Sequence, residues 1–185
     1  MANKGKYYES QFEEATIELL REAHWQYTFG DDIHRKYTDP LIEEDLRCFL
    51  AAQYKDKNLT TSEMDSIVAN LRNTGGQNDY YALRNAFLLY RDGYDFAYSD
   101  GRDNPFRLEY IDFEHPDHNI FHCVNQFVME QGRENRRPDI LLFINGIPVC
   151  IIELKNPTKQ NATIHDAHTQ ICTRYMRDIP ALLKY

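Results

Sequence analysis

Apolar side chains recur at helical spacing near the start of the chain. Over residues 7–24 they lie on one face of an amphipathic helix, and the residues concerned are Tyr8, Phe12, Ala15, Leu19, Leu20 and Ala23. Residues 25–29 follow as a short extended segment that ends at Gly30. The pattern therefore predicts a helix and then a strand.

Three further helices are predicted in the next part of the chain. Their expected spans are 41–54, 60–73 and 79–92. Pro40 stands at the first position of the first of them, and Thr60 with Glu63 has the spacing of a capping box. Gly93 stops the last helix. This stretch carries no recognisable chemistry, and we expect it to be a helical insertion at about 38–93.

The pattern changes to strand-like from residue 106 onward. Alternation begins at Phe106, and a second extended run covers residues 120–129. Two strongly apolar runs, at 139–144 and 147–155, flank Asn145-Gly146, which is the strongest short hairpin signature. A helix capped at Thr163 should then run to about residue 178. We expect the α/β class, with a mixed sheet built around the hairpin and flanked by the first and last helices.

Composition indicates one domain with a sizeable core. The 185 residues are 42% hydrophobic and 27% charged, with a net charge of −8. Neither a signal peptide nor an apolar run long enough to cross a membrane is present, so we expect a cytoplasmic protein without a membrane partner. The acidic total conceals a basic segment, because residues 131–159 carry 5 Lys and Arg against 3 Asp and Glu.

Charged residues stand at the ends of the two hairpin runs. Asp139 opens the first run, and Glu153 and Lys155 close the second. Carboxylates at the ends of buried strands are costly unless something pairs them, and a divalent cation held by Asp139 and Glu153 would do so. Lys155 lies on the same strand face as Glu153, where it could hold a water or stabilise charge on a phosphate oxygen.

The hairpin register decides whether the two carboxylates can share an ion. A two-residue turn at Asn145-Gly146 places Asp139 opposite Ile152, so that it points away from Glu153. A three-residue loop, or one bulge in either strand, would bring Asp139 and Glu153 to the same face. We expect this offset, with Gly146 in the left-handed conformation of a G1-type bulge.

These residues resemble a known nuclease signature, PD-(D/E)xK, in which Pro-Asp is followed by Glu-x-Lys after about fourteen residues. The wider pattern closely resembles the N-terminal nuclease domain of the restriction (motor) subunit of type I restriction-modification enzymes. The matching segments are Arg137-Pro138-Asp139-Ile140, Asn145-Gly146-Ile147-Pro148, Ile152-Glu153-Leu154-Lys155-Asn156, Gln170, Arg174-Tyr175 and Asp178-Ile179-Pro180.

The resemblance implies a single Mg²⁺-dependent endonuclease domain over 1–185 with a PD-(D/E)xK core. Its parts would be the helix at 7–24, the insertion at about 38–93, and the catalytic strands and last helix at about 106–180. It would be a fragment of a larger subunit that cuts double-stranded DNA without sequence specificity of its own. Mn²⁺ should substitute for Mg²⁺, and ATP would act only through domains outside this chain. Methyltransferase and specificity subunits are the implied protein partners.

The resemblance also assigns roles to residues. Asp139 and Glu153 match the magnesium ligands, Lys155 the catalytic lysine, and Glu13 the carboxylate from the first helix. Gln170 matches the glutamine of a Gln-x-x-x-Tyr helix motif, which completes the expected catalytic set.

The helix motif departs from the family pattern at its second position. Arg174 stands four residues after Gln170, and Tyr175 stands five residues after it, about 140° round a regular helix. Either the helix contains an irregular turn, or Arg174 contacts a phosphate in place of the tyrosine.

Four arginines are expected to contact the DNA backbone, independently of base sequence. They are Arg133, Arg136, Arg137 and Arg174.

Each assignment has a structural alternative. Glu153 and Lys155 could form an ordinary ion pair, Glu13 could belong to a solvated acidic face, and Gln170 could cap or pack. A zinc site is not expected at His115, His118, His122 and Cys123, nor at His165, His168 and Cys172.

Two other functions remain open at this level. One is a catalytically silent module of the same fold that binds DNA or docks in a larger complex, and the other is a structure-specific nuclease such as a junction resolvase. An inactive relative would be expected to lack Asp139, Glu153 or Lys155, and all three are present.

Overall fold

The computed structural model describes residues 9–75, 79–155 and 163–185. Its chain divides into two compact units. The first unit comprises residues 1–40, 121–143 and 148–183, and the second comprises 41–120, 144–147 and 184–185. Asn156, part of the family pattern, lies outside the described residues.

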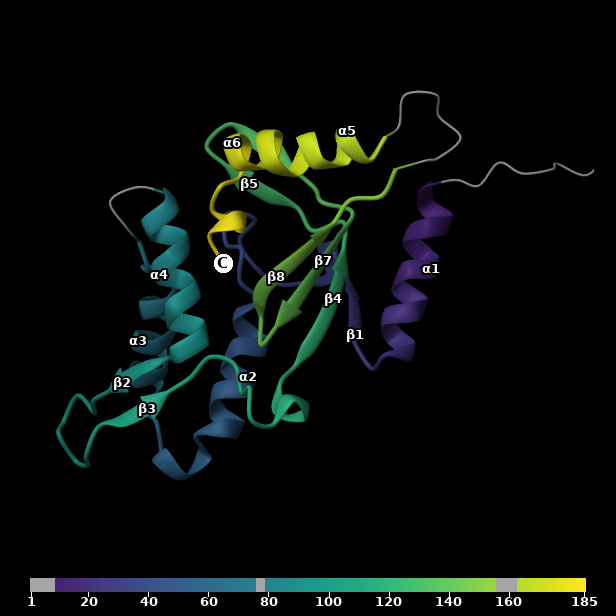
Figure 1. Cartoon of the computed structure of the whole chain (residues 1–185). Helices are drawn as coiled ribbons and strands as arrows, with labels where there is room; N and C mark the ends of the chain where they lie inside the picture. The colour runs from purple at the N-terminus through teal and green to yellow at the C-terminus, as the bar shows by residue number, and fades with distance from the viewer. Residues whose placement is uncertain (1–8, 76–78, 156–162) are drawn as a thin grey trace, which may run out of the picture. The chain divides into compact units, whose positions relative to one another are not determined.

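A four-stranded sheet in the order β1-β4-β7-β8 forms the centre of the first unit (Figure 1). The strands are β1 Gln26–Phe29, β4 Phe121–Asn125, β7 Ile140–Ile144 and β8 Ile147–Ile152. β1 runs parallel to β4, and β7 runs antiparallel to β4, because Gln126 donates to the Asp139 carbonyl at one end and Asn145 to the Ile120 carbonyl at the other. The sheet is mixed, as predicted.

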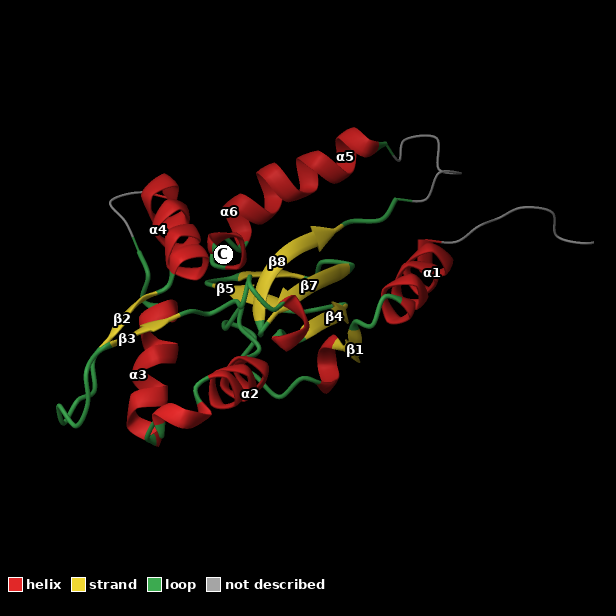
Figure 2. Cartoon of the chain, turned by 60° about the horizontal axis from the view of Figure 1, so that its bottom comes forward, coloured by secondary structure: helices red, strands yellow, loops and turns green. Residues whose placement is uncertain are grey.

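Helices flank this sheet. They are α1 Glu9–Glu22, α5 Ile164–Thr169 and α6 Met176–Asp178, and a π-helical turn, Gln170–Tyr175, joins the last two. Figure 2 shows α5, the π turn and α6 as one continuous rod. The expected cap at Thr163 is confirmed, since its hydroxyl accepts from the Asp166 N–H at 3.3 Å. A small hairpin, β5 Met129–Gln131 with β6 Glu134–Arg136, completes the unit.

The buried face of α1 differs from the predicted one. Ile17 is buried against Cys123 and Ile140 of the sheet, whereas Leu19 is 66% exposed and Phe12 is 36% exposed. The helix carries apolar residues on two neighbouring faces, and only the face centred on Ile17 meets the sheet. Spacing alone could not choose between these faces.

The second unit contains the expected helical block. Its helices are α2 Glu43–Gln53, α3 Thr61–Arg72 and α4 Asp79–Asp92, and a two-stranded sheet pairs β2 Tyr94–Phe96 with β3 Phe106–Leu108. The capping box of Thr60 and Glu63 is confirmed. The expected helix start at Pro40 is wrong, because α2 begins at Glu43 with Ile42 as its N-cap residue.

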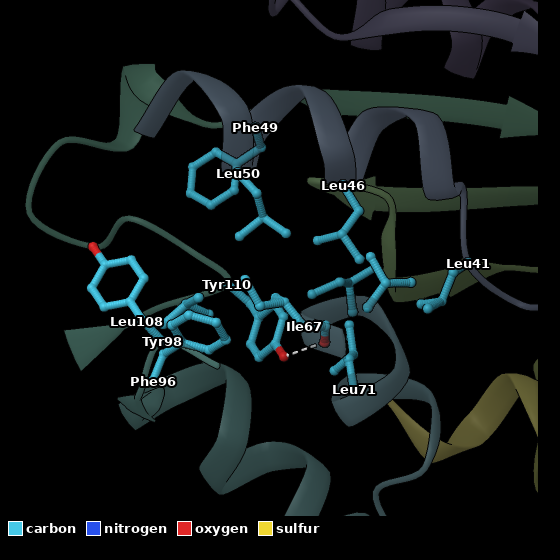
Figure 3. Close-up of a cluster of buried hydrophobic side chains, with 12 residues drawn as sticks. Leu41, Leu46, Phe49, Leu50, Ile67, Leu71, Phe96, Tyr98, Leu108 and Tyr110 are labelled. Atoms are coloured by element: carbon cyan, nitrogen blue, oxygen red, sulfur yellow. Dashed lines mark hydrogen bonds between the residues drawn. The ribbon is translucent and has the colours of Figure 1, made fainter. Parts of the chain in front are cut away.

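A continuous apolar core holds the second unit together (Figure 3). Leu46 and Leu50 of α2 and Ile67 and Leu71 of α3 are fully buried in it. The Tyr110 ring is also fully buried, and its hydroxyl donates to the Ile67 carbonyl oxygen at 2.8 Å. The core therefore includes one large aromatic whose polar atom is satisfied by a helix carbonyl.

The turn between β7 and β8 is tighter than predicted. Only Asn145 and Gly146 separate the strands, and their φ angles are +51° and +75°, as in a type I′ turn. The left-handed Gly146 is confirmed, but the three-residue loop and the G1-type bulge at the turn are wrong. The Asn145 side chain is fully buried and donates to the Tyr110 carbonyl at 2.9 Å, so this residue both forms and anchors the turn.

Irregularity is found in β8 instead of the turn. Its burial does not alternate, since Val149 and Cys150 are both exposed. At its end, the Leu154 N–H donates to Asp139 Oδ2 at 2.7 Å, so the Asp139 carboxylate lies beside the segment that carries Glu153.

No helix in the described part of the chain is both long and apolar enough to span a bilayer.

Replacing Gly146 tests the constraint at the turn. A Cβ there would meet the Ile42 carbonyl oxygen at 2.0 Å, in addition to the cost of a positive φ. Gly101 has a similar φ of +66° with nothing within 4 Å, which makes Gly101→Ala the matched control. We expect Gly101→Ala to lower the free energy of unfolding by about 1–2 kcal/mol and Gly146→Ala to lower it by clearly more. Urea unfolding measures the free energy of unfolding of both variants. Equal losses would contradict the close approach of Gly146 to the Ile42 carbonyl oxygen.

The capping box predicts acid sensitivity. Hydrogen bonds from Arg102, and then from Thr60, lower the pKa of Glu63 to about 2. Its ionised form therefore stabilises the fold above the ordinary pKa of about 4.5, and this stabilisation is lost as the pH falls toward 2. We expect Glu63→Gln to have a lower melting temperature than wild type at pH 7 and a smaller difference from it at pH 3. Thermal melts of both proteins at the two pH values measure this. An equal difference in melting temperature at pH 7 and pH 3 would refute the linkage.

Candidate active site

Glu153 follows β8 directly, and its side chain is only 1% exposed. Burial of a carboxylate is costly unless hydrogen-bond donors surround it. Tyr175 donates to Glu153 Oε1 at 2.5 Å, and Gln170 donates to Oε2 at 2.7 Å. The Lys155 ammonium lies 3.4 Å from the same Oε2 atom. Lys155 and Gln170, both predicted as site residues, and Tyr175, whose position the sequence left open, therefore converge on this carboxylate.

The irregular turn left open by the sequence is present in the last helix. Gln170 and Tyr175 begin and end the π turn, and Gln170 Nε2 donates to the Tyr175 hydroxyl at 2.8 Å. In a π turn the backbone bonds link residues five apart, so these two side chains share a face although a regular helix would separate them. The tyrosine thus reaches Glu153, and Arg174 does not take its place at this carboxylate.

The pKa of Glu153 is raised above its ordinary range. Burial is the largest cause, and the hydrogen bond from Tyr175 opposes it. The negative charge of Asp139 raises this pKa further, whereas the positive charge of Lys155 lowers it. The Asp139 charge thus disfavours the ionised form of Glu153, and a bound cation would relieve this repulsion.

Asp139 is held by both its main chain and its side chain. Its carbonyl oxygen accepts from the Gln126 N–H at 2.9 Å, and Oδ2 accepts from the Leu154 N–H. Within the described residues Oδ1 accepts no hydrogen bond, and Glu153 Oε1 accepts only the one from Tyr175. Each carboxylate thus keeps a lone pair for a further partner.

Glu13 is fixed by a different pair of residues. Asn125 donates to its Oε1 at 2.7 Å, and the Gln126 amide lies 3.1 Å from both of its oxygens. Glu13 is half-buried, whereas Glu14 and Glu18 on the same helix are exposed. It lines a hollow of about 360 Å³ beside α1 and β1. Glu13 is therefore distinguished from the solvated glutamates of its helix.

The three predicted carboxylates do not form one tight group. Among the described residues, one set of three metal-ligating side chains has its ligand atoms within 4.8 Å of one another, and that set is Asp112, His115 and His118. The first unit therefore brings Glu13, Asp139 and Glu153 to one part of the fold, but their carboxylate oxygens do not all lie within 4.8 Å of one another.

Arginines line a second hollow, of about 500 Å³, next to the π turn. Arg136, Arg137, Arg174 and Arg177 border it together with Gln170 and Tyr175. Arg133 is exposed and is not among the lining residues.

The lining arginines differ in their partners. Arg136 and Arg177 both bind the buried Asp178, with Nε–Oδ distances of 2.8 and 2.5 Å. In the described part of the chain, Arg137 and Arg174 have no acidic partner within 4.0 Å. Among the described arginines that line the hollow, these two are therefore the ones whose charge is not paired with a carboxylate.

The donor set suits a hard divalent cation. Mg²⁺ prefers oxygen ligands, and the site offers the carboxylates of Asp139 and Glu153 and the Leu154 carbonyl. Among the described residues, the side chains that contact these groups carry no sulfur and no imidazole. Asn125 and Gln126 were not foreseen as part of this site. The sequence feature that could have indicated them is their position directly after an apolar run, as two polar residues at the end of a strand. Gln126 adopts a φ of +54° there.

Comparison with known proteins gives one family match over most of the chain and several similar proteins. Residues 6–185 match the family described as "Type I restriction enzyme R protein N terminus". The Type I restriction enzyme HindI endonuclease subunit of Haemophilus influenzae is 28% identical over 96% of this chain. The provisionally named type I restriction enzyme MjaIXP endonuclease subunit of Methanocaldococcus jannaschii is 30% identical over 94% of it. The chain spans 17% of the length of each of these relatives.

The hydroxyl of Tyr175 can be tested by removing it. Tyr175→Phe leaves the Glu153 carboxylate and the Gln170 amide each without one partner, and we expect the free energy of unfolding to fall by about 1–3 kcal/mol. Tyr37→Phe is the control, because Tyr37 is 39% exposed in the same unit. Chemical denaturation compares the two, and an equal effect would mean that the Tyr175 hydroxyl does not support Glu153.

Proposed function

The chain belongs to the family of N-terminal domains of type I restriction enzyme R proteins, and from this membership we propose that it is a metal-dependent DNA endonuclease domain. The observation that carries the proposal is the convergence of Lys155, Gln170 and Tyr175 on the buried Glu153 carboxylate, with Asp139 beside it. The neighbouring Asp139 carboxylate distinguishes this group from a structural ion pair, because its negative charge raises the pKa of Glu153 and a bound cation would relieve that repulsion.

In the proposed mechanism, Asp139, Glu153 and the Leu154 carbonyl would hold Mg²⁺. Glu13, which lies farther from the two carboxylates than a common ion requires in this structure, would complete the set as the family resemblance implies. When bound, Mg²⁺ polarises the scissile phosphate and lowers the pKa of a coordinated water. Mn²⁺ is expected to substitute because it also accepts oxygen ligands.

The surrounding side chains have separate tasks in this mechanism. Gln170 and Tyr175 hold the Glu153 carboxylate in one orientation, and Asn125 and Gln126 do the same for Glu13. The Lys155 side chain is 23% exposed, so its ammonium can orient a water or neutralise charge on a phosphate oxygen.

Double-stranded DNA is the proposed substrate. Arg137 and Arg174, without acidic partners among the described residues, are suited to bind its phosphates at the arginine-lined hollow. Arg136 would contribute less because it is committed to Asp178, and Arg133 would contact the backbone from its exposed position. Phosphate contacts carry no base information, so cleavage would be independent of sequence.

The activity of the whole protein is part of the same proposal. Because the chain spans 17% of its relatives, ATP-driven translocation would reside in segments beyond it. Methyltransferase and specificity subunits would select the DNA, and the complex would work in the cytoplasm.

Calorimetric titration with Mn²⁺ tests the metal site without requiring DNA. We expect Glu153→Gln to lose one equivalent of Mn²⁺ that wild type binds, because one of two principal ligands is removed. Glu22→Gln is the matched control, since Glu22 is an exposed carboxylate in the same unit and does not line the hollow beside Glu13. Equal binding by wild type and Glu153→Gln, with both chains folded, would overturn the metal assignment.

Nicking of supercoiled plasmid in Mg²⁺ then separates the proposed nuclease from the catalytically silent module. Cleavage by wild type and none by Glu153→Gln supports the nuclease. If the full restriction complex assembled with this chain also binds metal without cutting, the catalytically silent docking module replaces the proposal.

A further inference from the structure

A second group of metal-ligating side chains lies in the second unit, outside the candidate active site. Asp112, His115 and His118 come from one short loop between β3 and β4, and their ligand atoms lie within 4.8 Å of one another. Nothing in the proposed nuclease chemistry uses these residues. The sequence pattern gave no reason to expect zinc at His115 and His118, because it did not show that Asp112 lies beside them. We propose that this loop binds one divalent transition-metal ion of the Zn²⁺ type.

The distances within the group suit such an ion. Asp112 Oδ2 lies 3.0 Å from His118 Nδ1 and 3.6 Å from His115 Nδ1. Ligand atoms about 2.0–2.1 Å from a tetrahedral Zn²⁺ are separated from each other by about 3.3 Å. The two observed distances bracket that value, so small side-chain rotations would suffice to admit the ion.

The carboxylate is prepared for this role by the backbone. Oδ1 of Asp112 accepts the N–H groups of Glu114 at 3.0 Å and His115 at 2.8 Å, while Gln53 donates to Oδ2 at 3.0 Å. These three donors hold the buried Asp112 carboxylate in one orientation.

The loop itself is rigid around the three ligands. The Asn119 side chain donates to the carbonyls of Asp112 at 2.7 Å and Pro116 at 3.0 Å, and its oxygen accepts the Asp112 N–H at 2.9 Å. The rings of His115 and His118 stack with centroids 4.9 Å apart, and this stacking would open as both Nδ1 atoms turn to one ion. Because the loop backbone is already held, the conformational cost of binding falls mainly on these two exposed rings.

Access and ligand type decide which ion fits. The side chains of His115 and His118 are 59% and 52% exposed, so an ion can enter from solvent and keep water in its remaining position. Two imidazoles and one carboxylate favour Zn²⁺, Ni²⁺ or Co²⁺ over Mg²⁺, which prefers oxygen ligands alone. This site is thus chemically distinct from the site around Glu153, and the inference does not depend on the proposed function.

Calorimetric titration with Zn²⁺ in excess Mg²⁺ tests the inference on the full chain. We expect wild type to bind one equivalent of Zn²⁺ that the double variant His115→Gln/His118→Gln does not bind. Both rings are largely exposed, so the variant should fold, and its melting curve checks this.

Two matched variants identify where any bound Zn²⁺ lies. His168→Gln removes a histidine near a cysteine, since His168 Nε2 lies 3.5 Å from Cys172 Sγ, and it should keep the equivalent. Glu153→Gln should keep it as well. Loss in either of these variants with retention in the double variant would overturn the inference, as would the absence of Zn²⁺ binding by wild type.

NMR of the histidine rings supplies a readout that needs no variant. Zn²⁺ is diamagnetic, and one equivalent should shift the ring resonances of His115 and His118 together. Shifts confined to other histidines would refute the assignment even if the stoichiometry were one.

Discussion

The burial of one carboxylate organises the candidate site. Glu153 is withdrawn from solvent at the end of β8, and its charge has to be compensated by groups that the rest of the first unit brings to it. The donors are a tyrosine and an amide from the last helix and an ammonium from the segment that follows β8. Each donor restricts one segment, so the end of the hairpin and the last helix are fixed by a single side chain.

The π turn is the helix geometry that this arrangement requires. Gln170 and Tyr175 are separated by one residue more than a regular helix allows for side chains on the same face. Opening the helix by one residue restores a common face, and both side chains then contact Glu153. Such turns carry poorer backbone bonds than an α-helix, and the hydrogen bonds to the buried carboxylate offset that cost.

The second unit is built on a more conventional principle. Its helices bury leucine, isoleucine and aromatic side chains in one core, and its polar residues act at loops. Asn145 and Asn119 bind each other and nearby backbone groups, which fixes the turn and the loop that carries His115 and His118. Satisfied polar groups of this kind keep short loops in a single conformation. The same rigidity that shapes the fold also presents ligand atoms to solvent.

Much of the architecture could be predicted from the sequence. The capping boxes at Thr60 and Thr163, the hairpin at Asn145-Gly146 and the mixed sheet were all foreseen, because each depends on local hydrogen bonding or on periodicity. The residues of the candidate site follow from their spacing and from a family resemblance.

The remaining features were decided by tertiary contacts. The sequence could not determine that Ile17 rather than Leu19 faces the sheet, or that burial does not alternate along β8, because both depend on which surfaces pack together. It left the position of Tyr175 open, since the local pattern does not distinguish a π turn from a regular helix, and in the structure the turn brings Tyr175 to the distant Glu153. Local patterns determine which elements form, and the burial of charge determines how their side chains meet.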